Sequence, residues 1–305
     1  MKDKSTILAE ARQKAEEELT GRRKLVSLYL FVNVMGLLIF CSCCFTFVMW
    51  QSPVGTRFYV IFLICFSFLA WWEMRRRLYT YPMNALKVFE TEPQGADDYI
   101  ERAGILYGYK FYEAAVDDYR TALKMEPDND LAWYDLAETL WRELRRSDEA
   151  LPIVEKLGGR ESDYQASALV FQGEILAEQD PEAAIKCFDQ AIDIEPDDFD
   201  HQLARLRFYV DTDRLDQATE AIVAVAKVQR KGWFHQCATF SELCGVMALK
   251  QGRPADAVKE LGKAIRLDSS KAEYYHIRSD AHAALGDHDK ADADRRKAQE
   301  LADDA

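Results

Sequence analysis

An uncharged apolar run from Leu25 to Trp50 constrains this chain more than any other feature of its sequence. As an α-helix the run would be about 39 Å long, which exceeds the ~30 Å hydrocarbon core of a bilayer. A cleaved signal peptide is excluded, because its apolar part is shorter and ends in small residues. Nothing else in the chain is apolar enough to cover such a run inside a soluble domain. We therefore expect a membrane-spanning helix.

A second apolar run, residues 58–72, follows a turn that contains Pro53 and Gly55. As a helix this run would span only about 22 Å, so flanking residues must extend it to 57–74 for a full crossing. A re-entrant segment and an interfacial helix are alternatives. A full crossing is favoured because the run has no polar face to leave at the interface. The two runs together predict a transmembrane hairpin.

Basic residues near the two runs predict the orientation of the hairpin. Residues 22–24 (Arg-Arg-Lys) precede the first run and residues 75–77 (Arg-Arg-Arg) follow the second, whereas the connecting loop carries Arg57 alone. Both ends of the hairpin, and the rest of the chain with them, are therefore expected in the cytoplasm, with a short loop on the far side. The lipid bilayer, and other transmembrane helices, are expected partners of this part.

Charge divides the chain into two different parts. Residues 1–95 hold 12 Lys and Arg against 8 Asp and Glu, whereas residues 96–305 hold 27 against 44. The acidic part argues against nucleic acid as a partner and permits basic ones, although solubility is the simpler reason for it. We expect a cytoplasmic N-terminal helix (1–24), a hairpin (25–74, with spans 25–50 and 57–74), a linker (75–95) and a soluble domain (96–305). The N-terminal helix is expected to be solvated, because its apolar face is thin.

The sequence offers no pattern typical of an enzyme. It contains no P-loop, no GxGxxG, no GxSxG and no HExxH, and its seven cysteines and five histidines show no metal-ligand spacing. We therefore expect no catalytic residues, no metal and no cofactor. Paired acids such as Asp97–Asp98, Asp117–Asp118 and Asp197–Asp198 are interpreted as capping and solubility residues.

Helical periodicity continues from residue 96 to the end of the chain, and small, aromatic and proline residues recur in it at a fixed period. Residues 96–129 supply Tyr99, Ala103, Leu106, Ala115, Tyr119, Ala122 and Pro127, and residues 165–198 supply Ala168, Ile175, Ala184, Phe188, Ala191 and Pro196. The step from Pro127 to Pro196 is one position longer than two periods of about 34, and the extra residue is placed in the turn of the intervening repeat from Asp130. Further repeats are expected from Phe199, near Ala238 and from Ala272.

This pattern resembles the tetratricopeptide repeat family over roughly residues 96–305. The resemblance implies an all-α chain in which the two-helix hairpin precedes a right-handed α-solenoid of about six repeats, with a concave groove that binds proteins or peptides. Carrying the family's groove positions across residue by residue gives the following candidates: Ile100, Tyr107, Leu131, Tyr134, Glu138, Trp141, Arg142, Leu169, Leu176, Leu203 and Arg207. The alternative is that Tyr107, Tyr134 and Trp141 pack against one another or against residues 1–20.

Two classes of function follow from these expectations. The first is a membrane-anchored scaffold that recruits cytoplasmic proteins or assists the assembly of a membrane complex. The second is a structural subunit of a large membrane assembly, with the hairpin packed against other transmembrane helices. A receptor for precursor proteins is a weaker third possibility. Some members of the family dock chaperones by binding a C-terminal carboxylate with Lys and Asn side chains. That role is disfavoured here, because the corresponding positions hold other residues: Ile100, Gly104, Leu169, Gly173, Glu242 and Val246.

Overall fold

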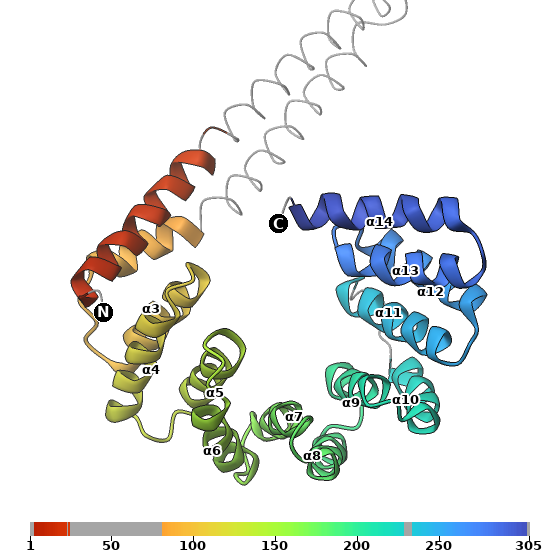
Figure 1. Ribbon diagram of the computed structural model, residues 1–305. Helices are drawn as coiled ribbons and strands as arrows, with labels where there is room; N and C mark the ends of the chain where they lie inside the picture. Colours follow the sequence, from red (N-terminus) through yellow and green to blue (C-terminus); the bar gives the residue numbers. More distant parts are fainter. Residues whose placement is uncertain (1–2, 23, 25–80, 229–233, 304–305) are drawn as a thin grey trace, which may run out of the picture. The chain divides into compact units, whose positions relative to one another are not determined.

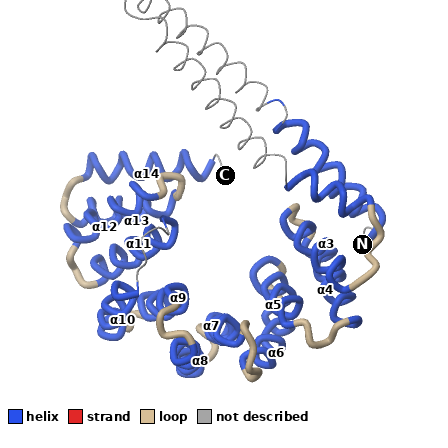
Figure 2. The backbone as a smooth tube through the Cα atoms, turned by 180° about the vertical axis from the view of Figure 1, so that it is seen from behind, coloured by secondary structure: helices blue, strands red, loops and turns tan. Residues whose placement is uncertain are grey.

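The structure, a computed structural model, describes residues 3–22, 24, 81–228 and 234–303. Within these ranges every regular element is helical, as Figure 2 shows, so the all-α prediction is confirmed. No helix of the described part is long and apolar enough to cross a membrane. The expected spans, 25–50 and 57–74, lie outside the described residues. The chain divides into two compact units, Met1–Arg145 and Arg146–Ala305.

The first unit begins with two helical segments that lie on either side of residues 25–80 in the sequence. These are the N-terminal helix, residues 4–22, and the helical segment 81–90. Four elements follow them: α3 (Ala96–Gly108), α4 (Tyr112–Met125), α5 (Asp130–Glu138) and the π-helix η1 (Thr139–Glu143) (Figure 1).

The second unit contains nine described helices: α6 (Ser147–Gly158), α7 (Gln165–Leu176), α8 (Pro181–Ile194), α9 (Phe199–Asp211), α10 (Leu215–Val228), α11 (Phe234–Lys250), α12 (Pro254–Leu267), α13 (Ala272–Ala284) and α14 (His288–Asp303). Helix α11 begins shortly before Ala238, near which the fifth repeat was expected to start.

The spacing of the helices confirms the repeat that the sequence predicts. In the pairs α3–α4, α7–α8, α9–α10 and α13–α14, the same number of positions separates the start of the first helix from the start of the second, and the two helices pack together. A second constant step leads from the start of α4, α6, α8 and α12 to the start of the helix that follows each. The two steps together make the expected period of about 34. Helices related in this way are antiparallel neighbours joined by short turns.

The extra residue of the second repeat was predicted in the turn between its helices. It lies instead at the end of the first helix. Helix α6 begins one position later after α5 than the spacing of the four regular pairs requires. The π-helix η1 absorbs the additional residue, and the Leu144 N–H donates to the Thr139 carbonyl five positions back at 3.2 Å. A single π-helical turn of this kind is rare and is found frequently at functional sites.

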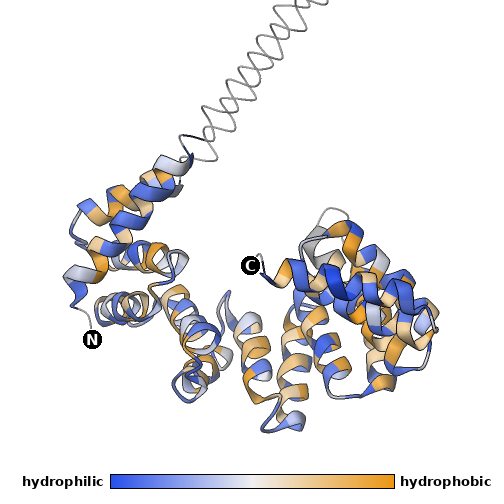
Figure 3. Ribbon diagram, turned by 45° about the horizontal axis from the view of Figure 1, so that its top comes forward, coloured by the Kyte–Doolittle hydropathy of each residue, from blue (hydrophilic) through white to orange (hydrophobic). Residues whose placement is uncertain are grey.

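Small residues allow the paired helices to approach closely. A Cβ added at Gly245 would lie 2.7 Å from Leu261 Cγ, and one at Gly173 would lie 3.0 Å from the Phe188 ring. Figure 3 shows hydrophobic and hydrophilic residues on different sides of the helices, as expected for helices that bury one face. The main core cluster of the second unit is built around Phe188, Leu206 and Val210.

Five hairpin turns share one backbone feature. A residue with positive φ stands two positions before the second helix in each: Lys110 (66°), Arg145 (57°), Asp213 (57°), Gly252 (69°) and Gly286 (78°). This left-handed conformation is free of strain only for glycine. The two of these five turns that have glycine at this position, Gly252 and Gly286, therefore close their hairpins with the residue type that suits it best.

The N-terminal helix docks on the first repeat, so the expectation that it is solvated was wrong. Ala11, Ala15 and Leu19 are buried. Ala15 packs with Ala85 and Ile105, so the two segments that flank residues 25–80 lie together against α3. An ion pair between Arg12 and Glu90 also joins the two segments, at 3.1 Å. The segments cover the side of the first repeat on which a preceding repeat would stack.

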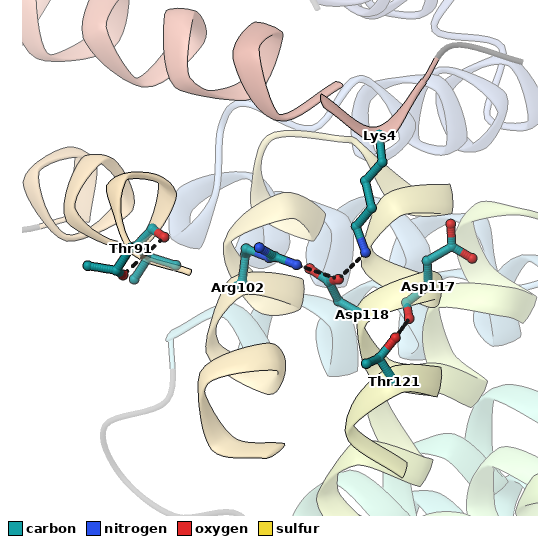
Figure 4. A network of polar contacts seen from close by, with 7 residues as sticks. Lys4, Thr91, Arg102, Asp117, Asp118 and Thr121 are labelled. Atoms are coloured by element: carbon teal, nitrogen blue, oxygen red, sulfur yellow. Dashed lines mark hydrogen bonds and ion pairs between the residues drawn. The ribbon is translucent and has the colours of Figure 1, made fainter. Parts of the chain in front are cut away.

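A buried ion pair inside the first repeat explains part of this docking (Figure 4). Arg102 donates to both carboxylate oxygens of Asp118, from Nε at 2.6 Å and from Nη2 at 2.9 Å. Lys4 of the N-terminal helix donates to Asp118 Oδ1 at 2.7 Å. The Asp118 side chain is fully buried, so its assignment as a solubility residue was wrong. Two positive groups compensate one desolvated carboxylate, and one of them comes from the docked helix.

The sixth repeat contains the same pair. Arg278 donates to Asp294 from Nε at 2.8 Å and from Nη2 at 2.7 Å, and in both repeats the acid stands 16 positions after its arginine. Tyr99 and Tyr275, each three positions before the arginine, lie under the two guanidinium groups, at 5.2 and 5.6 Å. A Tyr–Arg–Asp set therefore recurs as a feature of the repeat.

Candidate functional site

The candidate groove residues all lie on the first helix of a repeat. In the first unit they are Ile100 and Tyr107 on α3, Leu131, Tyr134 and Glu138 on α5, and Trp141 and Arg142 on η1. In the second unit they are Leu169 and Leu176 on α7, and Leu203 and Arg207 on α9.

The first unit brings aromatic and acidic side chains together around one of these candidates, Tyr107. Its hydroxyl donates to Glu143 Oε1 at 3.1 Å. Its ring meets the ring of Tyr112 edge to face, with centroids 5.4 Å apart, and the Tyr112 hydroxyl also hydrogen-bonds Glu143. Tyr107 therefore packs against Tyr112, which the sequence analysis did not name. We define the tyrosine–acid cluster as the six residues Tyr107, Tyr112, Tyr119, Asp135, Glu138 and Glu143.

The electrostatics of the cluster reflect partial burial next to negative charge. Burial, and then the hydrogen bond to Glu143, raise the pKa of Tyr107 to about 12. Burial, and then the charge of Glu138, raise the pKa of Asp135 to about 6, although a hydrogen bond from Tyr119 acts in the opposite direction. Burial and the nearby Asp135 raise the pKa of Tyr119 as well. The three carboxylates thus disfavour further negative charge at this place.

The basic residue next to the cluster is Arg142, another of the candidates. Its Nε lies 3.3 Å from Glu138 Oε1, and its guanidinium lies over the ring of Trp141, 5.1 Å from the centroid. The side chains of Arg142 and Glu138 are 46% and 36% exposed, so this pair is reachable from solvent. Leu131 on α5 is also exposed.

The raised pKa of Asp135 predicts a pH dependence of stability. Its folded pKa of about 6 lies above the ordinary value of 3.8, so the folded state binds the proton more tightly and loses stability as the pH rises from 4 towards 6. Replacing Asp135 with Asn removes this loss and keeps an acceptor for Tyr119. We expect the two proteins to be similarly stable at pH 4, and the Asn protein to be more stable at pH 7 by on the order of 1 kcal/mol, since partial exposure screens the effect.

Urea unfolding of the full chain in detergent micelles at both pH values, followed by circular dichroism, measures this difference. An equal separation between the two proteins at pH 4 and pH 7 would contradict the prediction. Glu101→Gln is the control, because Glu101 is exposed on α3.

Two candidates in the second unit are core residues and present no binding surface. Leu169 and Leu203 are 6% and 9% exposed. Leu169 packs with Ala166 and Ala191, and Leu203 belongs to the cluster around Phe188. Both lie on the side of their helix that contacts neighbouring helices. Leu176 is partly buried against the same cluster.

Arg207 is the exposed candidate of the second unit. Its Nη2 lies 4.0 Å from Glu242 Oε2 on α11. Burial raises the pKa of Glu242, and the charge of Arg207 acts against this effect. The pKa of Asp211 is raised for the same reason, and Arg207 again opposes the change. Arg207 therefore stabilises two partly buried carboxylates of its own unit.

One group of side chains between α8 and α9 has the composition of a metal site. Glu195, Asp198 and His201 each have a potential ligand atom within 4.8 Å of the others. However, Asp198 Oδ1 caps helix α9 by accepting the N–H groups of Asp200 and His201, at 2.8 and 2.9 Å. The positive end of the helix dipole at this position opposes a cation. The carboxylate is thus explained by its capping role.

Known protein families and one curated protein match parts of this chain. Models of the tetratricopeptide repeat match residues 110–166, 176–198 and 246–305, which include the pairs α7–α8 in part and α13–α14 completely. The mitochondrial import receptor subunit TOM70 of Homo sapiens is 25% identical in a match of 205 residues, which covers 64% of this chain and 32% of that protein. The matched part therefore spans about a third of the length of that relative.

Solved structures resemble the fold at lower identity. The type IV pilus biogenesis factor PilW is 18% identical, with a TM-score of 0.57 over 68% of this chain and 94% of its own. The APC/C hetero-tetramer Cut9–Hcn1 is 10% identical, with a TM-score of 0.63 over 74% of this chain and 43% of that chain. A tetratricopeptide repeat protein from Parabacteroides merdae is 16% identical, with a TM-score of 0.51 over 66% and 78%. The regularly spaced helix pairs and the matching repeat models together show that this chain contains tetratricopeptide repeats.

Proposed function

We propose that this protein is a membrane-anchored scaffold. Its repeats bind cytoplasmic proteins, and thereby recruit them to a membrane or assist the assembly of a membrane complex. Tetratricopeptide repeats are interaction modules that present extended surfaces to other polypeptides. The anchor is the pair of apolar runs within residues 25–74, with both flanks and the repeats in the cytoplasm.

The observation that carries the anchor is the meeting of the two flanks of residues 23–80. The Tyr109 hydroxyl, at the end of α3, donates to Glu18 Oε2 of the N-terminal helix at 2.7 Å. The ring of Tyr109 also lies 5.8 Å from the ring of Tyr81, which begins the segment 81–90. A chain that leaves one place and returns to it crosses a bilayer an even number of times. Two crossings are what the two apolar runs supply.

The same observation provides the test. Because residues 22 and 81 lie close to one another, a flexible linker of about ten Gly and Ser residues in place of residues 23–80 should leave the docked flanks and the repeats folded. The shortened protein should stay in the supernatant, whereas the intact chain should resist extraction from membranes at alkaline pH. External protease should digest the repeats of inverted vesicles and leave a protected fragment within residues 23–80. Release of the intact chain at alkaline pH would contradict the anchor.

The shortened protein also separates recruitment from a structural role. Crosslinking of the intact membrane protein followed by mass spectrometry identifies its neighbours. If the shortened protein captures the same neighbours, the repeats recruit them by themselves. If capture requires residues 23–80, the protein is instead a structural subunit held by its hairpin. A receptor for precursor proteins is the second candidate, and the similarity to an import receptor subunit over 64% of the chain favours it.

A further inference from the structure

The tyrosine–acid cluster has an uneven distribution of charge that indicates the chemistry of its partner. Three carboxyl groups, those of Asp135, Glu138 and Glu143, lie close to its tyrosines. Arg142 is paired with Glu138. The hydrogen bonds that Glu143 accepts come from the Tyr107 and Tyr112 hydroxyls, which are neutral groups. These groups orient the carboxylate of Glu143 but do not neutralise its charge.

The rings next to this carboxylate suit a cation. Tyr107 and Tyr112 meet edge to face at 5.4 Å, and an aromatic face beside a carboxylate attracts both ammonium and guanidinium groups. Arg142, next to the cluster, already shows this chemistry, since it lies both over the Trp141 ring and beside Glu138. Glu143 likewise lies beside aromatic rings, those of Tyr107 and Tyr112. The contacts described for Glu143 include no Lys or Arg.

The π-helical turn is what places Glu143 on the two tyrosines. The extra residue of η1 shifts the end of the first helix of the second repeat relative to the regular helix pairs described above. Thr139 anchors the turn by donating to the Asp135 carbonyl at 2.7 Å. The part of the repeat that departs from the common spacing is therefore the part that assembles the cluster.

Resting on the proposed function, we infer that the tyrosine–acid cluster binds a basic segment of a partner protein, with a Lys or Arg side chain placed between Glu143 and the rings of Tyr107 and Tyr112. The partner is a polypeptide because residues 96–305 carry 44 acidic against 27 basic residues, and this excess repels nucleic acid and anionic lipid headgroups. Electrostatic attraction raises the association rate, and contact with the rings selects a cation at this position.

The test uses the full chain in phosphatidylcholine nanodiscs, whose neutral surface does not attract basic peptides. The probe is a fluorescent amphipathic peptide of Leu, Ala and Arg, and the same peptide with Glu in place of Arg is its control. We expect the Arg peptide alone to bind. Glu143→Gln should weaken binding about five-fold, because it removes the charge but keeps an acceptor for both tyrosines. Glu138→Gln should weaken it less, because Glu138 is already paired with Arg142 and makes no contact with the peptide cation placed at Glu143.

The control protein is Glu101→Gln, which removes one exposed charge from α3 outside the cluster and leaves the net charge equal to that of Glu143→Gln. Unchanged binding to this variant, with weaker binding to Glu143→Gln, supports the inference. Equal binding to both would overturn it, since the peptide would then follow only the overall acidic charge. Absence of binding by the Arg peptide would overturn it too.

A competition experiment separates this inference from the proposed function. Neighbours of the intact protein are crosslinked with and without excess Arg peptide. If they are captured equally in both cases, the scaffold stands and the inference fails. If the repeats capture no neighbours at all, the proposed function itself has failed.

Discussion

Replacing Asp118 with Ala should destabilise the first unit by about 3–5 kcal/mol, because the change leaves Arg102 buried without its carboxylate. Arg102 is 5% exposed, and its Nε lies 2.6 Å from Asp118 Oδ2. The same change also releases Lys4 of the N-terminal helix. Hydrogen exchange of the full chain in micelles, resolved to α3, α4 and residues 4–22, should show faster exchange in all three.

The chain offers a matched control for this change. Asp294→Ala removes the equivalent carboxylate of the sixth repeat, where the side chains of Arg278 and Asp294 are 22% and 10% exposed. Water can reach that pair, so the loss should be smaller. The double change Arg102→Met with Asp118→Leu should recover much of the lost stability, because no charge remains to be desolvated. Similar losses for Asp118→Ala and Asp294→Ala would contradict this account.

Phe188→Ala should have the second large effect, a loss of about 3–5 kcal/mol of stability in the second unit. Phe188 is 1% exposed, packs 5.4 Å from the Phe208 ring and fills the space beside Gly173. Its removal opens a cavity among α7, α8 and α9 that the small residues around it cannot close. Val223→Ala is the control, because Val223 is 53% exposed on α10 and its truncation should change stability little.

Thermal unfolding measured by circular dichroism compares the two variants, and hydrogen exchange locates the effect. Exchange should accelerate in α7 to α9. A uniform increase throughout the second unit would show instead that its helices unfold together.

The repeat could be predicted from the sequence because its markers are local. Pro127 and Pro196 fix the phase, and the alanines between them mark the helix crossings. The extra residue of the second repeat was counted correctly but assigned to the turn. A π-helical turn and a longer loop change the count equally, and only the backbone distinguishes them.

The docking of the N-terminal helix could not be predicted from hydrophobicity. Ala11 and Ala15 bury little area, so a helix that uses them looks solvated in the sequence. The contact that fixes its end, from Lys4 to Asp118, joins residues 114 positions apart. No periodicity connects such residues.

The candidate site was predicted in part. The groove positions found Tyr107, Glu138 and Arg142, since these lie on first helices as in the family. Leu169 and Leu203 were chosen by the same rule, but in this chain they pack against neighbouring helices. Tyr112 and Glu143 were missed because they come together only through the π-helical turn.

The contact between Lys4 and Asp118 also sets an order of folding. Helices α13 and α14 close a hairpin over a short turn, and such local pairs form early. The contact of Lys4 with Asp118 closes a loop of 114 positions, so it can form only after Asp118 has been synthesised. During synthesis the first repeat therefore gains its cover only after its own second helix, α4, has been made.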